Sequence, residues 1–290
     1  MQANFVVFKR VLWYNTVMKH IDADIVRKEL VKLITDCLIV PDKSVTSALE
    51  KIDTDSVLEK TAAALIVENN RIAEEKRLYC CQDTGQAVFF VKIGDQTICA
   101  GLEDAIQSAV REAYKTARKS VADPITRKNT GDNTPAIIEY TLTRGECLEI
   151  TFLAKGAGSE NMSRLYMLTP ADGETGIVSA VVDAVKKGGK NACPPLVVGV
   201  GIGGVTETAC MLSKRALLRP VGQYSDRADI AALEKEIVGK VNALGIGVGA
   251  LGGGLTALAV NIETAPTHIG MLPVAVNLQC HSLRHGSVKF

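Results

Sequence analysis

Apolar side chains recur at helical spacing through the first quarter of the chain. Apolar residues three or four positions apart indicate an amphipathic helix with one buried face. Three helices are expected there: one capped by Asp22 or Asp24 and ending before Pro41, a second over 44–52, and a third that is capped by Thr54 or Asp55 and continues toward Arg77. The first 77 residues are therefore predicted to be mostly helical.

Beyond residue 77, short apolar runs typical of buried strands alternate with segments of helical spacing. Strands are expected over 88–93, 137–142, 148–152, 196–200, 257–262 and 272–279, the last of these being the final strand. Helices are expected over 102–119, 177–187, 205–213 and 229–244. The runs 137–142 and 148–152 are predicted to pair with each other across a turn at Arg144-Gly145. Without a linker or an internal repeat, the pattern predicts an α/β or mixed α+β fold, with a helical N-terminal region followed by mixed sheets flanked by helices.

Polar and glycine-rich stretches separate these elements. The segment 127–135, Arg-Lys-Asn-Thr-Gly-Asp-Asn-Thr-Pro, holds too many turn formers for regular structure, and 155–161, Lys-Gly-Ala-Gly-Ser-Glu-Asn, is predicted to be a second loop. Residues 199–204 match the dinucleotide-binding pattern G-x-G-x-x-G after a strand. A nicotinamide site also needs an acidic residue at a strand end about 20 residues later, where 219–226 is instead broken by Pro and Gly. Close backbone packing is the preferred interpretation of these glycines.

Composition narrows the class of partner. The chain has 290 residues, 33 Lys plus Arg against 32 Asp plus Glu, and a formal net charge of +1, without a long basic or acidic block. This balance argues against a nucleic-acid or anionic-lipid surface. No apolar run reaches the roughly 18 residues that span a bilayer, so no membrane role is expected. A small molecule or another protein is the expected partner.

The opening residues 1–17 combine apolar and aromatic side chains with Lys9-Arg10. Their apolar stretch is too short and interrupted for a secretory signal. An upstream start codon or a packed amphipathic lead-in is one explanation, and a targeting or membrane-surface role is the other. Residues 1–17 are therefore an N-terminal extension of unknown role, and 18–290 are expected to form the working domain.

Eight cysteines are spread along the chain without a CxxC motif, which is typical of a reduced, intracellular protein. A cytoplasmic location is expected. Cys81, Cys193 and Cys280 differ from the rest because each lies at the end of a predicted strand or just before one, beside polar residues or prolines. Such positions could converge on one pocket. From spacing alone, a three-cysteine metal site and ordinary loop cysteines both remain open.

His268 is the other residue that could carry chemistry, because it lies in a loop between two predicted strands. Loops held by a rigid scaffold are common places for catalytic groups. A structural or simply solvated histidine is the alternative. Ser159 has no nucleophile-elbow context and no nearby histidine, so a serine hydrolase is not expected.

Six phrases, in order and across nearly all of the chain after Met18, resemble the α component of class I (iron–sulfur) fumarate hydratases and the related L-tartrate dehydratases. They are Cys81-Gln-Asp-Thr-Gly85, Arg127-Lys-Asn-Thr-Gly-Asp-Asn-Thr-Pro135, Lys155-Gly-Ala-Gly-Ser-Glu-Asn161, Cys193-Pro-Pro195, Val198-Gly-Val-Gly-Ile-Gly-Gly204, and Leu272-Pro-Val-Ala-Val276 leading to Cys280. One departure is Ala157, which stands where the family phrase has the middle of three glycines.

The resemblance implies a [4Fe-4S] cluster held by Cys81, Cys193 and Cys280, with one iron free of protein thiolate. Such an open iron can act as a Lewis acid toward a substrate hydroxyl and carboxylate. The resemblance also implies catalytic roles for Asp83 and His268, Asp83 handling a proton near the leaving hydroxyl. The positions implied to bind substrate are Gln82, Arg118, Gly156 and Gly158.

The function implied is that of an α subunit of a hydro-lyase that hydrates fumarate to (S)-malate, a reaction of the tricarboxylic acid cycle. The phrases at 155–161 and 129–133 look closer to this fumarase branch. The alternatives are an L-tartrate dehydratase α subunit, or that of another hydroxydicarboxylate dehydratase, and a non-catalytic iron–sulfur scaffold. Because single-chain members continue into a second domain, the chain is expected to need a separate β subunit of about 200 residues, in a dimer of αβ pairs.

Overall fold

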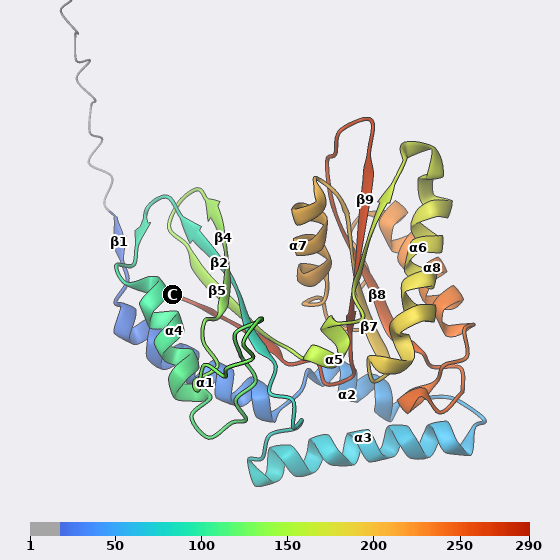
Figure 1. Ribbon diagram of the computed structural model, residues 1–290, viewed down its shortest axis with the longest axis horizontal. Coiled ribbons are helices and arrows are strands. Elements are labelled where there is room, and N and C mark those ends of the chain that lie inside the picture. The colour runs from blue at the N-terminus through green and yellow to red at the C-terminus, as the bar shows by residue number, and fades with distance from the viewer. Residues whose placement is uncertain (1–17) are drawn as a thin grey trace, which may run out of the picture.

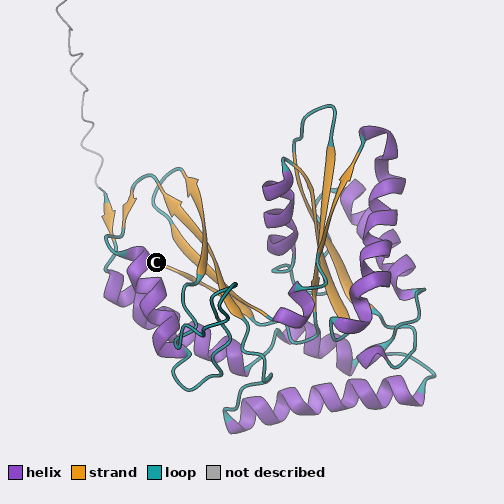
Figure 2. Cartoon of the chain, in the orientation of Figure 1, coloured by secondary structure: helices purple, strands orange, loops and turns teal. Residues whose placement is uncertain are grey.

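The computed structural model describes residues 18–290, and the expectations for residues 1–17 lie outside it. The chain forms two lobes, each built on a four-stranded mixed sheet, with helices on their outer sides and beneath them (Figure 1, Figure 2). The mixed α/β class predicted from the sequence is confirmed. Among the described helices, none combines the length and the apolar character that crossing a bilayer requires.

Three helices open the fold after the two-residue strand β1, Lys19–His20. The helices α1, Ala23–Ile39, and α2, Lys43–Glu50, begin after aspartate caps, and α1 has the predicted Asp22. The predicted caps of the third helix are wrong. Helix α3, Val57–Lys76, is capped by Ser56, whose hydroxyl accepts the amide N–H of Glu59, because the Thr54 hydroxyl instead donates to the Glu59 carboxylate.

The first sheet has the strand order β10-β5-β2-β4. Its strands are β2, Gln86–Gly94; β4, Ile137–Thr143; β5, Leu148–Lys155; and β10, His285–Lys289. The predicted pairing of β4 with β5 is wrong, because β2 lies between them, parallel to β4 and antiparallel to β5. The chain crosses the end of β2 between these strands, where a Cβ on Gly94 would lie only 1.9 Å from the carbonyl oxygen of Gly145.

The prediction that the last strand ends at residue 279 is also wrong, because β10 follows it. Strand β10 pairs antiparallel with β5, from His285 opposite Leu153 to Lys289 opposite Glu149. Helix α4, Leu102–Ala113, packs with α1 on this lobe and ends before Tyr114, not at residue 119 as predicted. The short strand β3, Thr97–Ile98, pairs in parallel with β1.

The second sheet has the order β6-β9-β7-β8. Its strands are β6, Arg164–Leu168; β7, Leu196–Gly203; β8, Ala257–Ala265; and β9, Leu272–Gln279. Helix α7, Thr206–Ala216, covers one face, while α6, Gly173–Gly188, and α8, Ala228–Asn242, lie on the other (Figure 1). Cβ atoms on Gly199 and Gly201 would each lie 2.0 Å from carbonyl oxygens of α7, so these glycines permit close helix–strand packing as predicted.

The two lobes share a core at their base. Side chains of β2 and β5 pack in one cluster with side chains of β7, β8, α2 and α3; the cluster includes Val88, Leu153, Val197, Ala259 and Leu49. Helix α3 runs beneath both sheets (Figure 1). The predicted loop 155–161 enters this junction and holds a short helix, α5, Ala157–Glu160. Three 3₁₀ turns complete the fold, at Pro170–Asp172, Gly189–Asn191 and Val248–Ala250.

Candidate active site

Asp83 is fixed between the two lobes by backbone groups. Its Oδ1 accepts the N–H of Gly85 at 2.9 Å, and its Oδ2 accepts the N–H of Ala157, the first residue of α5, at 2.8 Å. Its carbonyl oxygen accepts Nη1 of Arg284 at 2.7 Å. The carboxylate lines a cavity of about 370 Å³ between the lobes. A partly buried carboxylate in a cavity is the kind of group that acts as a general acid or base.

Gly156 leaves room for this carboxylate. A Cβ at position 156 would lie 3.1 Å from Asp83 Oδ2, which is tighter than most real contacts. Gly158 is different, because a Cβ there would meet only the carbonyl oxygen of Asn191 at 3.8 Å. Of the two glycines predicted to bring backbone close to a substrate, only Gly156 is thus required by space around Asp83.

The adjacent thiols Cys80 and Cys81 have different surroundings. Cys80 is buried, with its sulfur 3.6 Å from the Ser282 hydroxyl, whereas Cys81 is partly exposed. Burial raises the pKa of the Cys80 thiol, as expected for an inert core cysteine. The difference agrees with the alternation expected of an extended segment.

The segments that carry Cys193 and Cys280 lie at the same end of the second sheet. Strands β7 and β9 are antiparallel, Cys193 lies three residues before β7, and Cys280 directly follows β9. The N–H of His281 donates to the Cys193 carbonyl oxygen at 3.4 Å. Cys193 has the left-handed φ of 53° and precedes a cis Pro194–Pro195 bond. Its side chain is exposed, while Cys280 is partly buried.

The three predicted ligand thiols act on one another electrostatically. Burial raises the pKa of Cys193, and negative charge on Cys81 and Asp83 raises it further. Burial also raises the pKa of Cys280, Arg284 opposes that rise, and Cys193 adds to it. Each thiol therefore lies within electrostatic range of the next, although the three belong to different segments of both lobes.

The side chains of this chain suit an iron–sulfur cluster better than a single metal ion. Among residues 18–290, no three His, Cys, Asp or Glu side chains are placed to hold a single metal ion. A [4Fe-4S] cluster makes a different demand, because its thiolates bind separate irons and need not converge on one point. The free thiols of Cys81, Cys193 and Cys280, which belong to segments of both lobes and form no disulfide, are the ligand type that such a cluster binds.

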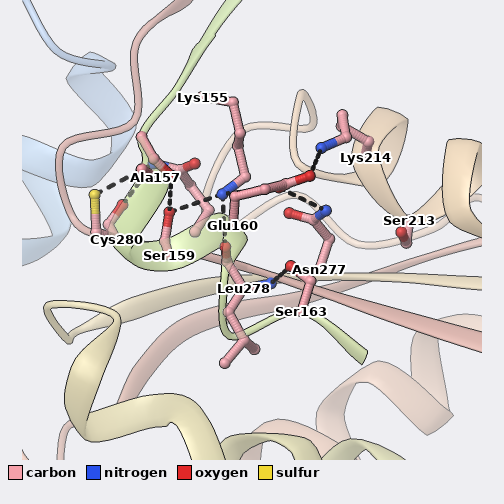
Figure 3. Close-up of polar contacts among 12 residues, drawn as sticks. Lys155, Ala157, Ser159, Glu160, Ser163, Ser213, Lys214, Asn277, Leu278 and Cys280 are labelled. Carbon is pink, nitrogen blue, oxygen red and sulfur yellow. Dashed lines mark hydrogen bonds and ion pairs between the residues drawn. The ribbon is translucent and has the colours of Figure 1, made fainter. Parts of the chain in front are cut away.

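A buried ionic network lies beside Cys280 (Figure 3). Lys155 Nζ donates to the Ser159 hydroxyl at 2.7 Å and to the Leu278 carbonyl oxygen at 2.9 Å, and it lies 3.3 Å from Glu160 Oε2. Glu160 also pairs with Lys214. Burial lowers the pKa of Lys155 to about 8, against the charge of Glu160. The network ties the end of β5 to β9 just before Cys280.

The structure places the remaining predicted residues unevenly. Gln82 is exposed beside Asp83, and Arg118 is exposed, with its carbonyl oxygen accepting the Thr84 hydroxyl at 2.9 Å. His268 is not brought near the cysteines. It lies exposed before β9, whereas Cys280 follows β9, so eight strand residues, about 26 Å at 3.3 Å each, separate the two.

Sequence reasoning missed Lys155 and Arg284. Lys155 opens one of the six family-like phrases, yet nothing in the phrase indicates that its side chain is 2% exposed. Arg284 is 1% exposed and follows Cys280 by four residues. A basic residue beside a predicted ligand cysteine was the only available signal.

Comparison with known proteins decides the family. The model described as "Fumarate hydratase (Fumerase)" matches residues 27–289. The chain belongs to this family. A relative from Methanocaldococcus jannaschii, named "Putative L(+)-tartrate dehydratase subunit alpha", is 41% identical over 264 residues, covering 87% of this chain and 92% of the relative. The "L(+)-tartrate dehydratase subunit alpha" of Escherichia coli (strain K12) is 33% identical over 257 residues, covering 86% and 85%.

These matches confirm the resemblance to class I fumarate hydratases and tartrate dehydratases found in the sequence. The chain is a subunit of the hydro-lyase type that this family contains. The fumarase-family match extends over both lobes, so the segments that carry Cys81, Asp83, Cys193 and Cys280 all lie within it. The substrate is not fixed by membership, because the family model and the relatives carry the names of different enzymes.

Proposed function

We propose that this chain is the α subunit of a hydro-lyase that removes water from a hydroxydicarboxylate, with L(+)-tartrate as the first candidate substrate. The observations that support the proposal are that the segments carrying Cys193 and Cys280 lie at one end of the second sheet, and that Arg284, four residues after Cys280, binds the backbone of Asp83, two residues after Cys81. The names of the relatives support tartrate over fumarate as the substrate.

Cys81, Cys193 and Cys280 would hold a [4Fe-4S] cluster through their thiolates. When bound, the cluster supplies a Lewis acid at an iron without a protein thiolate, which weakens the carbon–oxygen bond of a substrate hydroxyl. Dehydration expels that hydroxyl from one carbon and takes a proton from the adjacent carbon, so that one water leaves. Asp83 is the group of this chain that would deliver a proton to the departing oxygen.

The substrate's carboxylates need donors. Gln82, next to Asp83 in the sequence, and Arg118, whose carbonyl oxygen accepts the Thr84 hydroxyl, are both exposed and would offer an amide and a guanidinium. The base for the carbon-bound proton is assigned to a partner, because the α-subunit names of the relatives imply a separate β subunit. A β subunit of about 200 residues, in a dimer of αβ pairs, would complete the site.

Fumarate hydration is the second candidate. The family model carries that enzyme's name, and the phrases at 129–133 and 155–161 look closer to the fumarase branch. The same residues serve both reactions, since malate and tartrate both carry a hydroxyl next to a carboxylate. They differ in a second hydroxyl, whose contacts would come largely from the partner.

Anaerobic reconstitution tests the proposal. The chain, co-expressed with its β subunit, is loaded with iron and sulfide, and kcat/KM is measured on L(+)-tartrate and (S)-malate. We expect turnover of tartrate, at least roughly tenfold above malate if tartrate is the substrate. Cys193→Ser should lose the cluster absorbance and the activity. Cys210→Ser is the matched control, because Cys210 is an exposed thiol on α7.

Two outcomes would contradict the proposal. Equal iron and sulfide content in Cys193→Ser and the wild type would refute the ligand assignment. A cluster-loaded complex that turns over neither acid would favour the non-catalytic scaffold. Malate turnover that exceeds tartrate turnover would instead select the fumarase activity.

A further inference from the structure

We propose that the buried guanidinium of Arg284 is the fixed countercharge of the cofactor held at Cys81, Cys193 and Cys280, and that it positions the segment carrying Cys81 and Asp83. The inference rests on the proposed function, because it assigns the residue a role toward that cofactor. Arg284 would be a positioning residue, since its side chain is too buried to reach a substrate.

Arg284 is the largest of the fully buried side chains, at 1% exposure. It forms no ion pair with a carboxylate among residues 18–290, and its Nε is buried without any hydrogen-bond partner. In the described part of the chain, two other largely buried cations are paired. Arg219 pairs with Glu234 and Glu263, and Lys155 pairs with Glu160. An unpaired charge in a protein interior is strongly unfavourable, so Arg284 calls for a countercharge.

The residues around Arg284 do not supply a directly paired countercharge. Its Nη1 binds a neutral group, the Asp83 carbonyl oxygen, at 2.7 Å. The Asp83 carboxylate keeps its charge while it accepts the N–H groups of Gly85 and Ala157, but neither of its oxygens forms an ion pair with the guanidinium.

The segment that carries Arg284 lies beside thiols. Cys280 precedes Arg284 by four residues, the Cys80 sulfur lies 3.6 Å from the Ser282 hydroxyl, and a Cβ on Gly286 would lie 2.9 Å from the Cys37 sulfur. Cys37 and Cys80 are core thiols, while Cys280 is a proposed ligand. Three thiolates outweigh the charge of a [4Fe-4S] core, so the loaded site is anionic. No carboxylate of the described residues pairs with Arg284, and the anionic cluster site would be its countercharge.

The contact with Asp83 adds a second effect. Arg284 lies four residues after Cys280, and its hydrogen bond holds the Asp83 carbonyl, two residues after Cys81. One side chain therefore links the segments that carry two of the three proposed ligands. A neutral donor could keep this hydrogen bond, but only a cation could balance the anion.

The test separates charge from structure by measuring the full chain with and without cofactor. Thermal unfolding, retention of iron against a chelator, and the midpoint potential are compared for wild type, Arg284→Gln and Arg284→Lys. Arg284→Gln should leave the Tm of the cofactor-free chain unchanged or raised, because an unpaired buried charge is removed. The Tm of the loaded chain should fall, with retention roughly tenfold weaker and a more negative potential. Arg284→Lys should restore most of the cofactor retention and most of the midpoint potential.

Arg219→Gln is the matched control, because it also removes a buried guanidinium but leaves two carboxylates unpaired. Its Tm should fall equally with and without cofactor, and its potential should not move. If Arg284→Gln lowers the Tm of the cofactor-free chain as much as that of the loaded chain, Arg284 is purely structural and the inference is refuted. The same holds if retention and potential match the wild type. A wild type that binds no iron and sulfide would refute the proposed function itself.

Discussion

At the scale of single residues, the Asp83 carboxylate can take its position because Gly156, beside it, has no side chain. Gly156 has φ −69° and ψ 140°, a conformation that any residue adopts, so its backbone does not require glycine. The limited space beside Asp83 Oδ2 does require glycine at this position. Ala157, the departure from the family phrase, still donates its N–H to that oxygen, and its side chain is exposed. The departure therefore leaves the contact intact.

Gly156→Ala should move the carboxylate without unfolding the protein. The new Cβ would lie 3.1 Å from Asp83 Oδ2, so the carboxylate must shift by a few tenths of an ångström and its bond to Ala157 must weaken. We expect kcat/KM to fall roughly 10- to 100-fold with little change in Tm. Gly158→Ala is the control and should stay within about twofold of wild type. Equal losses in both variants would show that Gly158 itself approaches the substrate.

At the scale of elements, the start of α2 fastens the segment that follows Cys280. Asp42 caps α2 by accepting the N–H of Ser44 at 2.8 Å, and its other oxygen lies 3.1 Å from Nε2 of His285 on β10. Its own N–H donates to the Leu283 carbonyl oxygen at 2.8 Å. Although burial raises the pKa of Asp42, its contact with His285 and its hydrogen bonds from Ser44 outweigh that effect and lower the pKa to about 2.

Asp42 should make the fold sensitive to acid. A carboxyl whose pKa is lowered by folding contributes stability above its ordinary pKa of 3.8, and that contribution is lost as the pH falls toward about 2. The shift corresponds to about 2 kcal/mol. Asp42→Asn should therefore lower the free energy of unfolding by about 2 kcal/mol at pH 6, and by roughly half as much at pH 3. Urea unfolding at both pH values measures this.

The exposed Asp24 on α1 provides the control for that comparison. Asp24→Asn removes a carboxylate that pairs with Arg27 and Lys28 at the surface, where solvent screens the interaction. Its effect should be small at both pH values. A destabilisation by Asp42→Asn that is equal at pH 6 and pH 3 would mean that the carboxylate's charge is not what stabilises the fold.

The elements themselves were largely predictable, but their neighbours were not. Periodicity located α1, α8 and three strands of the second sheet, β7, β8 and β9, because local spacing of apolar residues determines which segments are regular. Strand β6 was not predicted. Strand pairing is non-local, so nothing in the runs 137–142 and 148–152 indicated that β2 would lie between them. Strand β10, His-Gly-Ser-Val-Lys, lacks an apolar run and is a strand because it pairs with β5.

The site shows the same division. Spacing alone left three distant cysteines undecided, and only the resemblance to a family proposed them as one set. Arg284 looks like any surface arginine in the sequence, because its burial depends on the packing of two lobes. His268 lies twelve residues before Cys280, yet the intervening residues form a strand that carries the two apart. Proximity along the chain was misleading there.

At the scale of the whole molecule, the proposed chemistry is divided between two ends of the second lobe. The cysteines and Asp83 lie at the junction of the lobes, whereas His268 lies in the loop that joins β8 to β9, at the other end (Figure 1). This loop is exposed, and Ile269 next to His268 is 91% exposed. A histidine so placed can reach a cysteine site only if that site belongs to another copy of the chain.

Two inactive variants should therefore restore activity when they share one assembly. Cys193→Ser removes a ligand but keeps His268, and His268→Ala does the reverse. In a symmetric pair of αβ units, a mixed assembly has one site with both features, so roughly half of the wild-type activity should return. Co-expression with two affinity tags isolates the mixed assembly, and steady-state rates measure it. His20→Ala, which removes an exposed histidine on β1, should keep full activity alone. A purified mixed assembly no more active than either parent would show that His268 does not act across copies, and its assignment as a catalytic residue would then have no geometric basis.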